Sequence, residues 1–377
     1  MMVCQRINLK NSSTNKWIGN MDIKLDDLYE QLKNSRITQE QALDNIRELW
    51  NGRDSENGES ENALFEREWK KILLNDENVL VTQADVCDEE LIVLVGAINI
   101  NAIEFERYCH SSVSIKTRCV VMHSQQSRSD EQYQYYAQEL LQVLKSLLQE
   151  RPRQRIRVRL LVFSQCRNGA PRESSVMIGL FGMLTSAAYE NPLIEPQLVE
   201  LDVEESTSEL IEKMETLQKG TISRNKIVRF LGDRIEFSCW KKIKDGQALR
   251  DDSYPWRNKA IYLITGGLGG LGLVFAKEIA SKVNDAILIL TGRRSLQDVR
   301  GSGFDDTLAE LRGMGAHCVY RQVDVANYSE LSSLFATIGD EFGQLNGIIH
   351  SAGLTKDNFI LHKSSDELGE VFDPKVT

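Results

Sequence analysis

The sequence TGGLGGLG at Thr265–Gly272 decides the fold of the C-terminal third of the chain. It follows the apolar stretch Ala260–Ile264 and leads into the amphipathic stretch Gly270–Lys282, so we expect a strand, a glycine-rich turn and a helix in that order. Glycine lets backbone N–H groups come close to a pyrophosphate at the start of a helix, where unpaired N–H groups and the helix dipole favour negative charge. The turn therefore predicts a dinucleotide-binding unit. Its expected cofactor-binding residues are Thr265, Gly266, Gly267, Leu268, Gly269, Gly270, Leu271 and Gly272.

The end of the second expected strand selects the form of the cofactor. An NAD site places Asp or Glu there to bond the ribose hydroxyls, whereas this sequence has Arg293 and Arg294. A carboxylate would repel a 2′-phosphate, while a guanidinium binds it bidentately and stacks on adenine. The sequence therefore predicts NADPH rather than NADH, and the alternative is that the two arginines only form a solvated loop. Asp324, followed by Val325, comes after the third expected strand, where it either bonds the adenine amino group or caps a helix.

The C-terminal third alternates strands and helices throughout. This rhythm predicts four parallel strands and three crossover helices. The expected strands are Ala260–Ile264, Ala286–Thr291, His317–Val323 and Gly347–Ser351. The expected helices are Gly270–Lys282, Asp305–Met314 and Ser329–Phe342.

Residues 63–250 indicate an earlier α/β body whose parallel sheet is covered on both faces. Its expected strands are Val79–Val81, Ile92–Val95, Arg118–Met122, Val158–Phe163 and Gln197–Leu201. Its other expected elements are the helices Gln132–Leu148 and Ser174–Tyr189, the second one buried, and a hairpin over Ile227–Trp240 that turns at Gly232–Asp233. No glycine-rich turn follows these strands, so this body has the layout of a nucleotide-binding fold without the residues that grip a nucleotide. We interpret the basic run Arg151–Arg159 as the solvated entry to a strand rather than an anion site.

The region before this body is polar and weakly patterned. Residues 1–20 are expected to be disordered. Two short amphipathic segments within 22–49 are expected to form helices that pack on each other, on the body or on a partner chain. The hydrophilic stretch Asn51–Asn62 is an expected linker. The predicted division of the chain is thus 1–20, 21–62, 63–250 and 251–377.

Composition excludes several other classes of protein. The chain has 377 residues and a net charge of -10, which argues against general nucleic-acid binding. Its seven cysteines are scattered without metal-ligand spacing, so we expect free thiols and no metal. No apolar run reaches the about 20 residues that span a bilayer, which predicts a cytoplasmic protein without membrane association.

Four motifs together resemble those of the short-chain dehydrogenase/reductase superfamily: TGGLGGLG, TGRRS, VDV at 323–325 and HSAG at 350–353. More narrowly, HSAGLTKDNFILHKS running into FDPKVT resembles the ketoreductase domain of modular polyketide synthases, in which a cofactor-free Rossmann half precedes the active half. The resemblance implies two Rossmann-like parallel-sheet subdomains, a degenerate structural half and then an incomplete NADP-binding half, after a short N-terminal helical segment.

The same resemblance implies an activity and partners. NADPH would reduce a β-ketoacyl group that an acyl carrier protein holds as a phosphopantetheine thioester, alongside other polyketide synthase domains. Residues 22–49 resemble interdomain or dimerisation segments of such synthases, which implies a homodimer formed through them.

The family's site residues carry over onto a few positions of this sequence. Ala352 and Gly353, with Ser351 before them, match the segment beside the nicotinamide ribose. Lys375 aligns with the catalytic lysine, whose ammonium group lowers the pKa of the catalytic tyrosine; the alternative is an ordinary surface lysine. Asp357 aligns with the last Asp of an LDD motif associated with the B-type hydroxyl configuration. Thr and Lys precede Asp357 where the motif has Leu and Asp, so Asp357 equally fits a loop residue bonded to its own backbone.

The family's catalytic serine and tyrosine come after the segment that contains Lys375, and this sequence ends at Thr377. We therefore expect the chain alone to be nearly inactive, because general acid catalysis contributes about 10²–10⁴-fold. A fragment, a truncated product and half of a split domain all fit this expectation. Two other hypotheses stay open, a non-catalytic scaffold or docking module of an assembly line and a free-standing short-chain reductase.

Overall fold

The structure is a computed structural model that describes residues 65–71, 87–97, 99–111, 115–164, 166–167, 170–171, 176–219, 227–232, 234–242, 255–299 and 303–376. The expected disordered lead, the helical pair at 22–49, the linker and the strand Val79–Val81 lie outside these residues.

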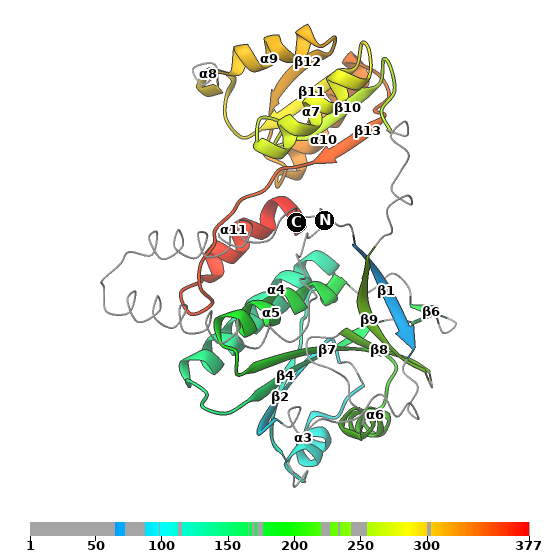
Figure 1. The fold of residues 1–377 in the computed structure, drawn as a ribbon, viewed down its shortest axis with the longest axis vertical. Helices are drawn as coiled ribbons and strands as arrows, with labels where there is room; N and C mark the ends of the chain where they lie inside the picture. Colours follow the sequence, from blue (N-terminus) through cyan, green and yellow to red (C-terminus); the bar gives the residue numbers. More distant parts are fainter. Residues whose placement is uncertain are drawn as a thin grey trace, which may run out of the picture. The chain divides into compact units, whose positions relative to one another are not determined.

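The first sheet has seven strands in the order β1-β9-β8-β7-β4-β2-β3 (Figure 1). The strands are β1 (Phe65–Lys71), β2 (Glu89–Val95), β3 (Lys116–Met122), β4 (Ile156–Ser164), β7 (Ile194–Asp202), β8 (Ile227–Leu231) and β9 (Arg234–Lys242). The strands from β8 through β3 pair in parallel, and β8 and β9 form the predicted antiparallel hairpin. A separate two-stranded ribbon joins β5 (Cys166–Arg167) and β6 (Ala170–Pro171).

Helices pack on both faces of this sheet, as predicted. One core joins it to α4 (Ser129–Gln149) and α5 (Phe181–Glu190), and the other joins it to α3 (Ala102–Ser111) and α6 (Thr207–Lys219). Tyr136, Leu140, Leu144 and Leu147 of α4 are buried, because residues three and four apart share one side of a helix.

Two predictions for this body were wrong. The expected buried helix Ser174–Tyr189 is a short 3₁₀ helix, η2 (Val176–Leu180), followed by α5, and Tyr189 is 77% exposed because α5 packs through one side only. The basic run ends on a buried residue rather than a solvated one. Arg159 is 1% exposed on the central strand β4, where its guanidinium lies 2.8 Å from a Glu90 carboxylate oxygen and donates to Gln197 at 2.7 Å. Both faces of a central strand are covered, so this charge is buried and needs its partner.

The second sheet has four parallel strands in the order β12-β11-β10-β13. Its strands are β10 (Ile261–Thr265), β11 (Ile287–Gly292), β12 (His317–Gln322) and β13 (Gly347–His350). The crossovers contain α7 (Gly270–Lys282), α8 (Leu296–Val299), α9 (Phe304–Gly313) and α10 (Tyr328–Glu341), and α11 (Ser365–Val376) follows. The predicted strands and crossover helices are confirmed, while α8 and α11 were not foreseen.

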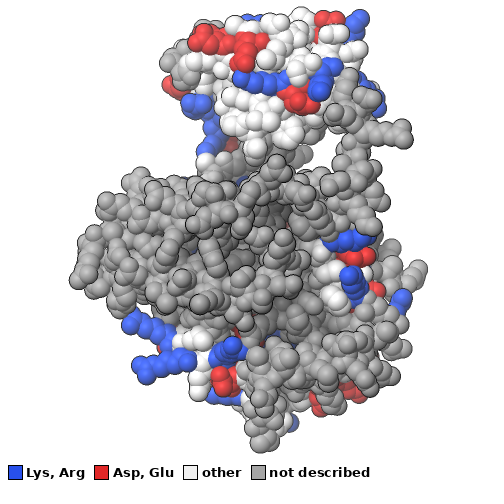
Figure 2. All heavy atoms as spheres, viewed as in Figure 1, with Lys and Arg blue, Asp and Glu red and all other residues white. Residues whose placement is uncertain are grey.

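The surface of the described residues carries both charge signs. On the face drawn in Figure 2, acidic and basic side chains occur together over the part that contains β10 to β13. Among the described residues, no helix combines the length and apolar character needed to cross a bilayer. The same residues contain no cluster of His, Cys, Asp or Glu suited to a metal ion.

Candidate coenzyme site

The glycine turn joins β10 to α7 and is packed too tightly for side chains at three positions. Gly266 has a φ of +62°, and a Cβ there would lie 2.8 Å from Ala352 Cα. A Cβ on Gly267 would lie 2.7 Å from Leu290 Cβ, and one on Gly272 would lie 2.5 Å from the Gly266 carbonyl oxygen. These approaches explain why the sequence uses glycine here.

The turn ends at an uncapped helix start. The Gly269 N–H donates to the Gly266 carbonyl at 2.8 Å, and α7 begins at the next residue without a side-chain cap. An uncapped helix N-terminus presents unpaired N–H groups and the positive end of the helix dipole, which suit a phosphate.

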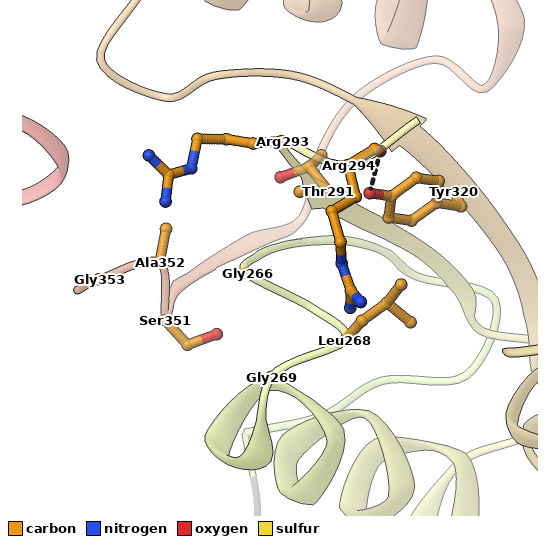
Figure 3. A pocket seen from close by; sticks show the side chains of 11 residues that line it. Gly266, Leu268, Gly269, Thr291, Arg293, Arg294, Tyr320, Ser351, Ala352 and Gly353 are labelled. Atoms are coloured by element: carbon orange, nitrogen blue, oxygen red, sulfur yellow. Dashed lines mark hydrogen bonds between the residues drawn. The ribbon is translucent and has the colours of Figure 1, made fainter. Parts of the chain in front are cut away.

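A cleft of about 200 Å³ opens beside this turn, where β10, β11 and β13 end (Figure 3). It brings together nearly half of the sequence-predicted residues. Its lining consists of Gly266, Leu268, Gly269, Thr291, Gly292, Arg293, Arg294, Tyr320, Ser351, Ala352 and Gly353. In the view of Figure 3, the Arg294 guanidinium lies toward Leu268, and the Arg293 guanidinium lies toward Ala352.

Three side chains of this lining, those of Arg293, Arg294 and Thr291, form no ion pair or hydrogen bond with the described residues. Arg293 and Arg294 are exposed, and neither makes an ion pair with a described residue. Thr291 is fully buried, and its Oγ1 has no hydrogen-bond partner within the described part of the chain. A buried hydroxyl without a partner costs about 1–3 kcal/mol, so a ligand that bonded it would remove a penalty.

Thr265 does not line the cleft but fixes the segment that does. Its hydroxyl accepts from the Ser351 and Ala352 N–H groups at 3.2 and 3.3 Å and lies 2.8 Å from His350 Nδ1. His350 Nε2 lies 2.7 Å from the Pro374 carbonyl oxygen. One arrangement satisfies every atom: Nε2–H donates to Pro374, and the Thr265 hydroxyl donates to Nδ1. His350 thus joins the glycine turn to α11.

Lys375 stands near the end of α11, one residue after this link. A Cβ built on Gly353 would lie 3.1 Å from Lys375 Cε, so the structure brings these two predicted residues together. The Lys375 side chain is exposed and makes no hydrogen bond or ion pair with a described residue.

α11 is also anchored on the first α/β body. The Phe372 ring packs on Tyr133 of α4 with centroids 5.6 Å apart, and Leu368 is buried in the same core. Just before α11, the Ile360 N–H donates to both carboxylate oxygens of Glu190, at 2.9 and 3.1 Å. Burial raises the pKa of Glu190, although this N–H bond acts in the opposite direction.

Several predicted residues lie outside the cleft lining. Asp324 accepts from the Ala326 N–H at 3.1 Å, and α10 is capped by Asn327, so Asp324 is not the helix cap considered above. Val325 is half-buried, and Asp357 is exposed in the segment before α11. Gly267, Gly270, Leu271 and Gly272 belong to the turn but not to the lining.

Sequence reasoning missed five contributors: Thr291, Gly292, Tyr320, Gln322 and His350. His350 stood in the quoted HSAG motif, where its imidazole was a usable signal. Tyr320 and Gln322 are two positions apart on β12, so both side chains lie on the same side of β12. β12 pairs with β11, the strand that the two arginines follow.

This arrangement defines a class of protein. A parallel sheet with a glycine turn after its first strand, and a cleft where its strands end, is a Rossmann-type dinucleotide-binding fold.

Comparison with known proteins narrows the class. Residues 260–377 match the family described as the KR domain. Polyketide synthase PksN of Bacillus subtilis (strain 168) is 38% identical over 262 residues, which cover 68% of this chain and 4% of that protein. PksL of the same organism is 36% identical over 258 residues, which cover 68% and 5%. This chain thus spans about a twentieth of the length of these relatives.

The structural comparison agrees. A crystal structure of a ketoreductase domain from the bacillaene assembly line aligns with a TM-score of 0.66 and 28% identity, covering 83% of this chain and 68% of that one. The chain belongs to the ketoreductase domain family of polyketide synthases, whose members use a nicotinamide cofactor.

Proposed function

We propose that this chain supplies the NADPH site of a polyketide synthase ketoreductase. The cleft fits such a dinucleotide: the tight glycine turn leaves backbone N–H groups for a pyrophosphate, and the partnerless Thr291 hydroxyl offers a polar contact. The observation that carries the proposal is the pair of exposed arginines in the cleft lining, because two guanidinium groups suit a 2′-phosphate. The lining residues include no Asp or Glu that would repel this phosphate.

The proposed reaction is reduction of a β-ketoacyl thioester on an acyl carrier protein. When bound, NADPH supplies the hydride that converts the β-keto group into a β-hydroxyl group. Ser351, Ala352 and Gly353 would hold the nicotinamide ribose. Lys375, next to Gly353, would place a positive charge near the developing alkoxide and lower the pKa of a neighbouring proton donor.

Asp324 with Val325 at the adenine, and Asp357 at the substrate, remain proposals. The same holds for a homodimer through 22–49, for other polyketide synthase domains as partners, and for low activity of the 377 residues alone.

Coenzyme binding tests the proposal directly. We expect isothermal titration calorimetry to give a dissociation constant for NADPH at least about tenfold below that for NADH, since a bidentate guanidinium–phosphate bond is among the stronger polar contacts. The double variant Arg293→Ala/Arg294→Ala should bind both coenzymes equally. Equal affinity in the unaltered chain would contradict the assignment of NADPH.

A further inference from the structure

The arginine turn, Thr291–Arg294, has a hydrogen bond to each of its main-chain carbonyls. Two of its four carbonyl oxygens are bound by backbone groups: Thr291 accepts from the Gly267 N–H at 3.0 Å, and Gly292 accepts from the Val323 N–H at 2.9 Å. The first bond links the end of β11 to the residues that follow β10, and the second links it to the residue that follows β12.

The other two carbonyls are bound by side chains of β12. The Arg293 carbonyl accepts from Gln322 Nε2 at 3.1 Å, and the Arg294 carbonyl accepts from the Tyr320 hydroxyl at 2.8 Å. The second bond is the dashed line in Figure 3. Neither bond follows from strand pairing, so both depend on the identity of these two residues.

Tyr320 is well placed to hold the turn still. Its side chain is nearly buried, and its ring packs edge-on against Phe304 with centroids 5.5 Å apart. Burial raises the pKa of Tyr320, although the charge of Arg294 acts in the opposite direction. A phenol is protonated at neutral pH and can therefore donate. A Cβ on Gly292 would lie 2.9 Å from this hydroxyl, so the glycine leaves room for it.

Fixing the main chain of Arg293 and Arg294 matters because their side chains are exposed and free of ion pairs with described residues. When a mobile turn binds a ligand, its backbone becomes ordered, and the lost conformational entropy lowers the affinity. On a fixed turn, only the side-chain torsions remain to be ordered. The benefit is largest for the 2′-phosphate, because the two arginines bind it through their charge and NADH lacks it.

We infer that Tyr320 and Gln322 are specificity-determining positioning residues, which hold the two arginines in place for a ribose 2′-phosphate without touching the coenzyme's phosphate themselves. This inference rests on the proposed function, because it assigns the 2′-phosphate to Arg293 and Arg294.

The test compares matched variants of the 377-residue chain. Tyr320→Phe removes one hydroxyl, and Gln322→Met removes one amide donor with little change in length. Tyr262→Phe is the control: Tyr262 is also buried on a strand of this sheet, packs edge-on against Trp256, and accepts at its hydroxyl from the Arg257 N–H at 2.8 Å. Its hydroxyl therefore holds a main-chain segment other than the arginine turn.

Dissociation constants for NADPH, NADH, adenosine 2′,5′-bisphosphate and AMP are measured by calorimetry for each protein. We expect Tyr320→Phe and Gln322→Met each to reduce the NADPH-over-NADH preference by about two- to tenfold, the range of one hydrogen bond. The preference for adenosine 2′,5′-bisphosphate over AMP should fall in parallel, and NADH affinity should stay within about twofold. Tyr262→Phe should leave both preferences unchanged.

Three results with the variants would overturn the inference alone. Preferences that survive in both β12 variants would show that the arginines need no such support. An equal loss of affinity for NADPH and NADH would indicate that the substitution loosens the whole cleft. The same conclusion would follow if Tyr262→Phe reduced the preferences as much as the β12 variants do. Absence of any preference in the unaltered chain would instead refute the proposed coenzyme, and the inference with it.

Discussion

Glycines of the turn between β10 and α7 are needed for different physical reasons, although the sequence repeats one residue type. Gly266 adopts a left-handed backbone conformation that L side chains rarely take. Gly272 has an ordinary helical backbone, but a Cβ added there would collide with the main chain of the turn. A Cβ on Gly270 would meet no described atom within 4 Å apart from its chain neighbours and the nearby backbone of its own helix. Two glycines of one helical turn thus differ in what an added methyl group would meet.

This contrast gives a prediction for two otherwise identical substitutions. Gly272→Ala should lower the free energy of unfolding by about 1–3 kcal/mol or more, because its Cβ would collide with backbone that cannot move aside. Gly270→Ala should be neutral or raise it by up to about 1 kcal/mol, since alanine reduces the freedom of the unfolded chain. Chemical denaturation without coenzyme measures both. Equal destabilisation by the two variants would mean that the turn is looser than described.

At the scale of elements, α11 carries Lys375 but depends on residues far away in sequence. Its anchors are Tyr133 and Glu190 on the first body and His350 on β13. The Glu190 contact carries a cost, because burial raises the pKa of this carboxyl above its ordinary value of 4.5. A carboxyl with a raised folded-state pKa binds its proton more tightly in the folded chain. It therefore favours folding below pH 4.5, and that contribution is lost as the pH rises through the folded pKa.

Glu190→Gln should consequently raise the thermal unfolding midpoint at neutral pH, because the amide oxygen can still accept from the Ile360 N–H and no charge is buried. The gain should shrink as the pH falls toward 4.5, where the native carboxyl becomes protonated. Glu139→Gln, an exposed glutamate on α4, serves as the control and should leave the midpoint unchanged. A lower midpoint for Glu190→Gln at neutral pH would show that the charged bond to Ile360 outweighs its burial.

Sequence patterns predicted most strands and helices of this fold, since short apolar runs that alternate with amphipathic segments leave few alternatives. α11 was missed because its proline is an unusual residue for a helix interior. The end of the basic run was misjudged because Arg159 is covered by partners 38 and 69 positions away, on β7 and β2. The position of the cleft could be predicted from local sequence motifs. Tyr320 and Gln322 could not, because they donate to main-chain carbonyls of the arginine turn, and a sequence pattern does not show which side chains bind main-chain groups.

At the scale of the whole molecule, two parallel sheets share a layout but differ in what their strand ends offer to an anion. In open α/β sheets, ligands bind where the strands reach their carboxyl ends. The second sheet has a glycine turn and two arginines there. The corresponding end of the first sheet has Glu200, which accepts from the Ser164 hydroxyl at 3.0 Å, and Asp202 at the end of β7. Carboxylates repel phosphates, so this edge is unsuited to the ligand that the other edge favours.

Hydrogen exchange of the whole chain should therefore respond to NADPH at one sheet only. Saturating coenzyme at about 100 times its dissociation constant stabilises the state that binds it by about 2.7 kcal/mol, so amides of Thr265–Gly272 and Thr291–Arg294 should exchange more slowly. Amides that follow β4 and β7 should keep their rates. NADH at the same concentration is the control and should protect the same segments less. Slower exchange after β4 or β7 with NADPH would show a second coenzyme site and refute the assignment of the first body as a cofactor-free half.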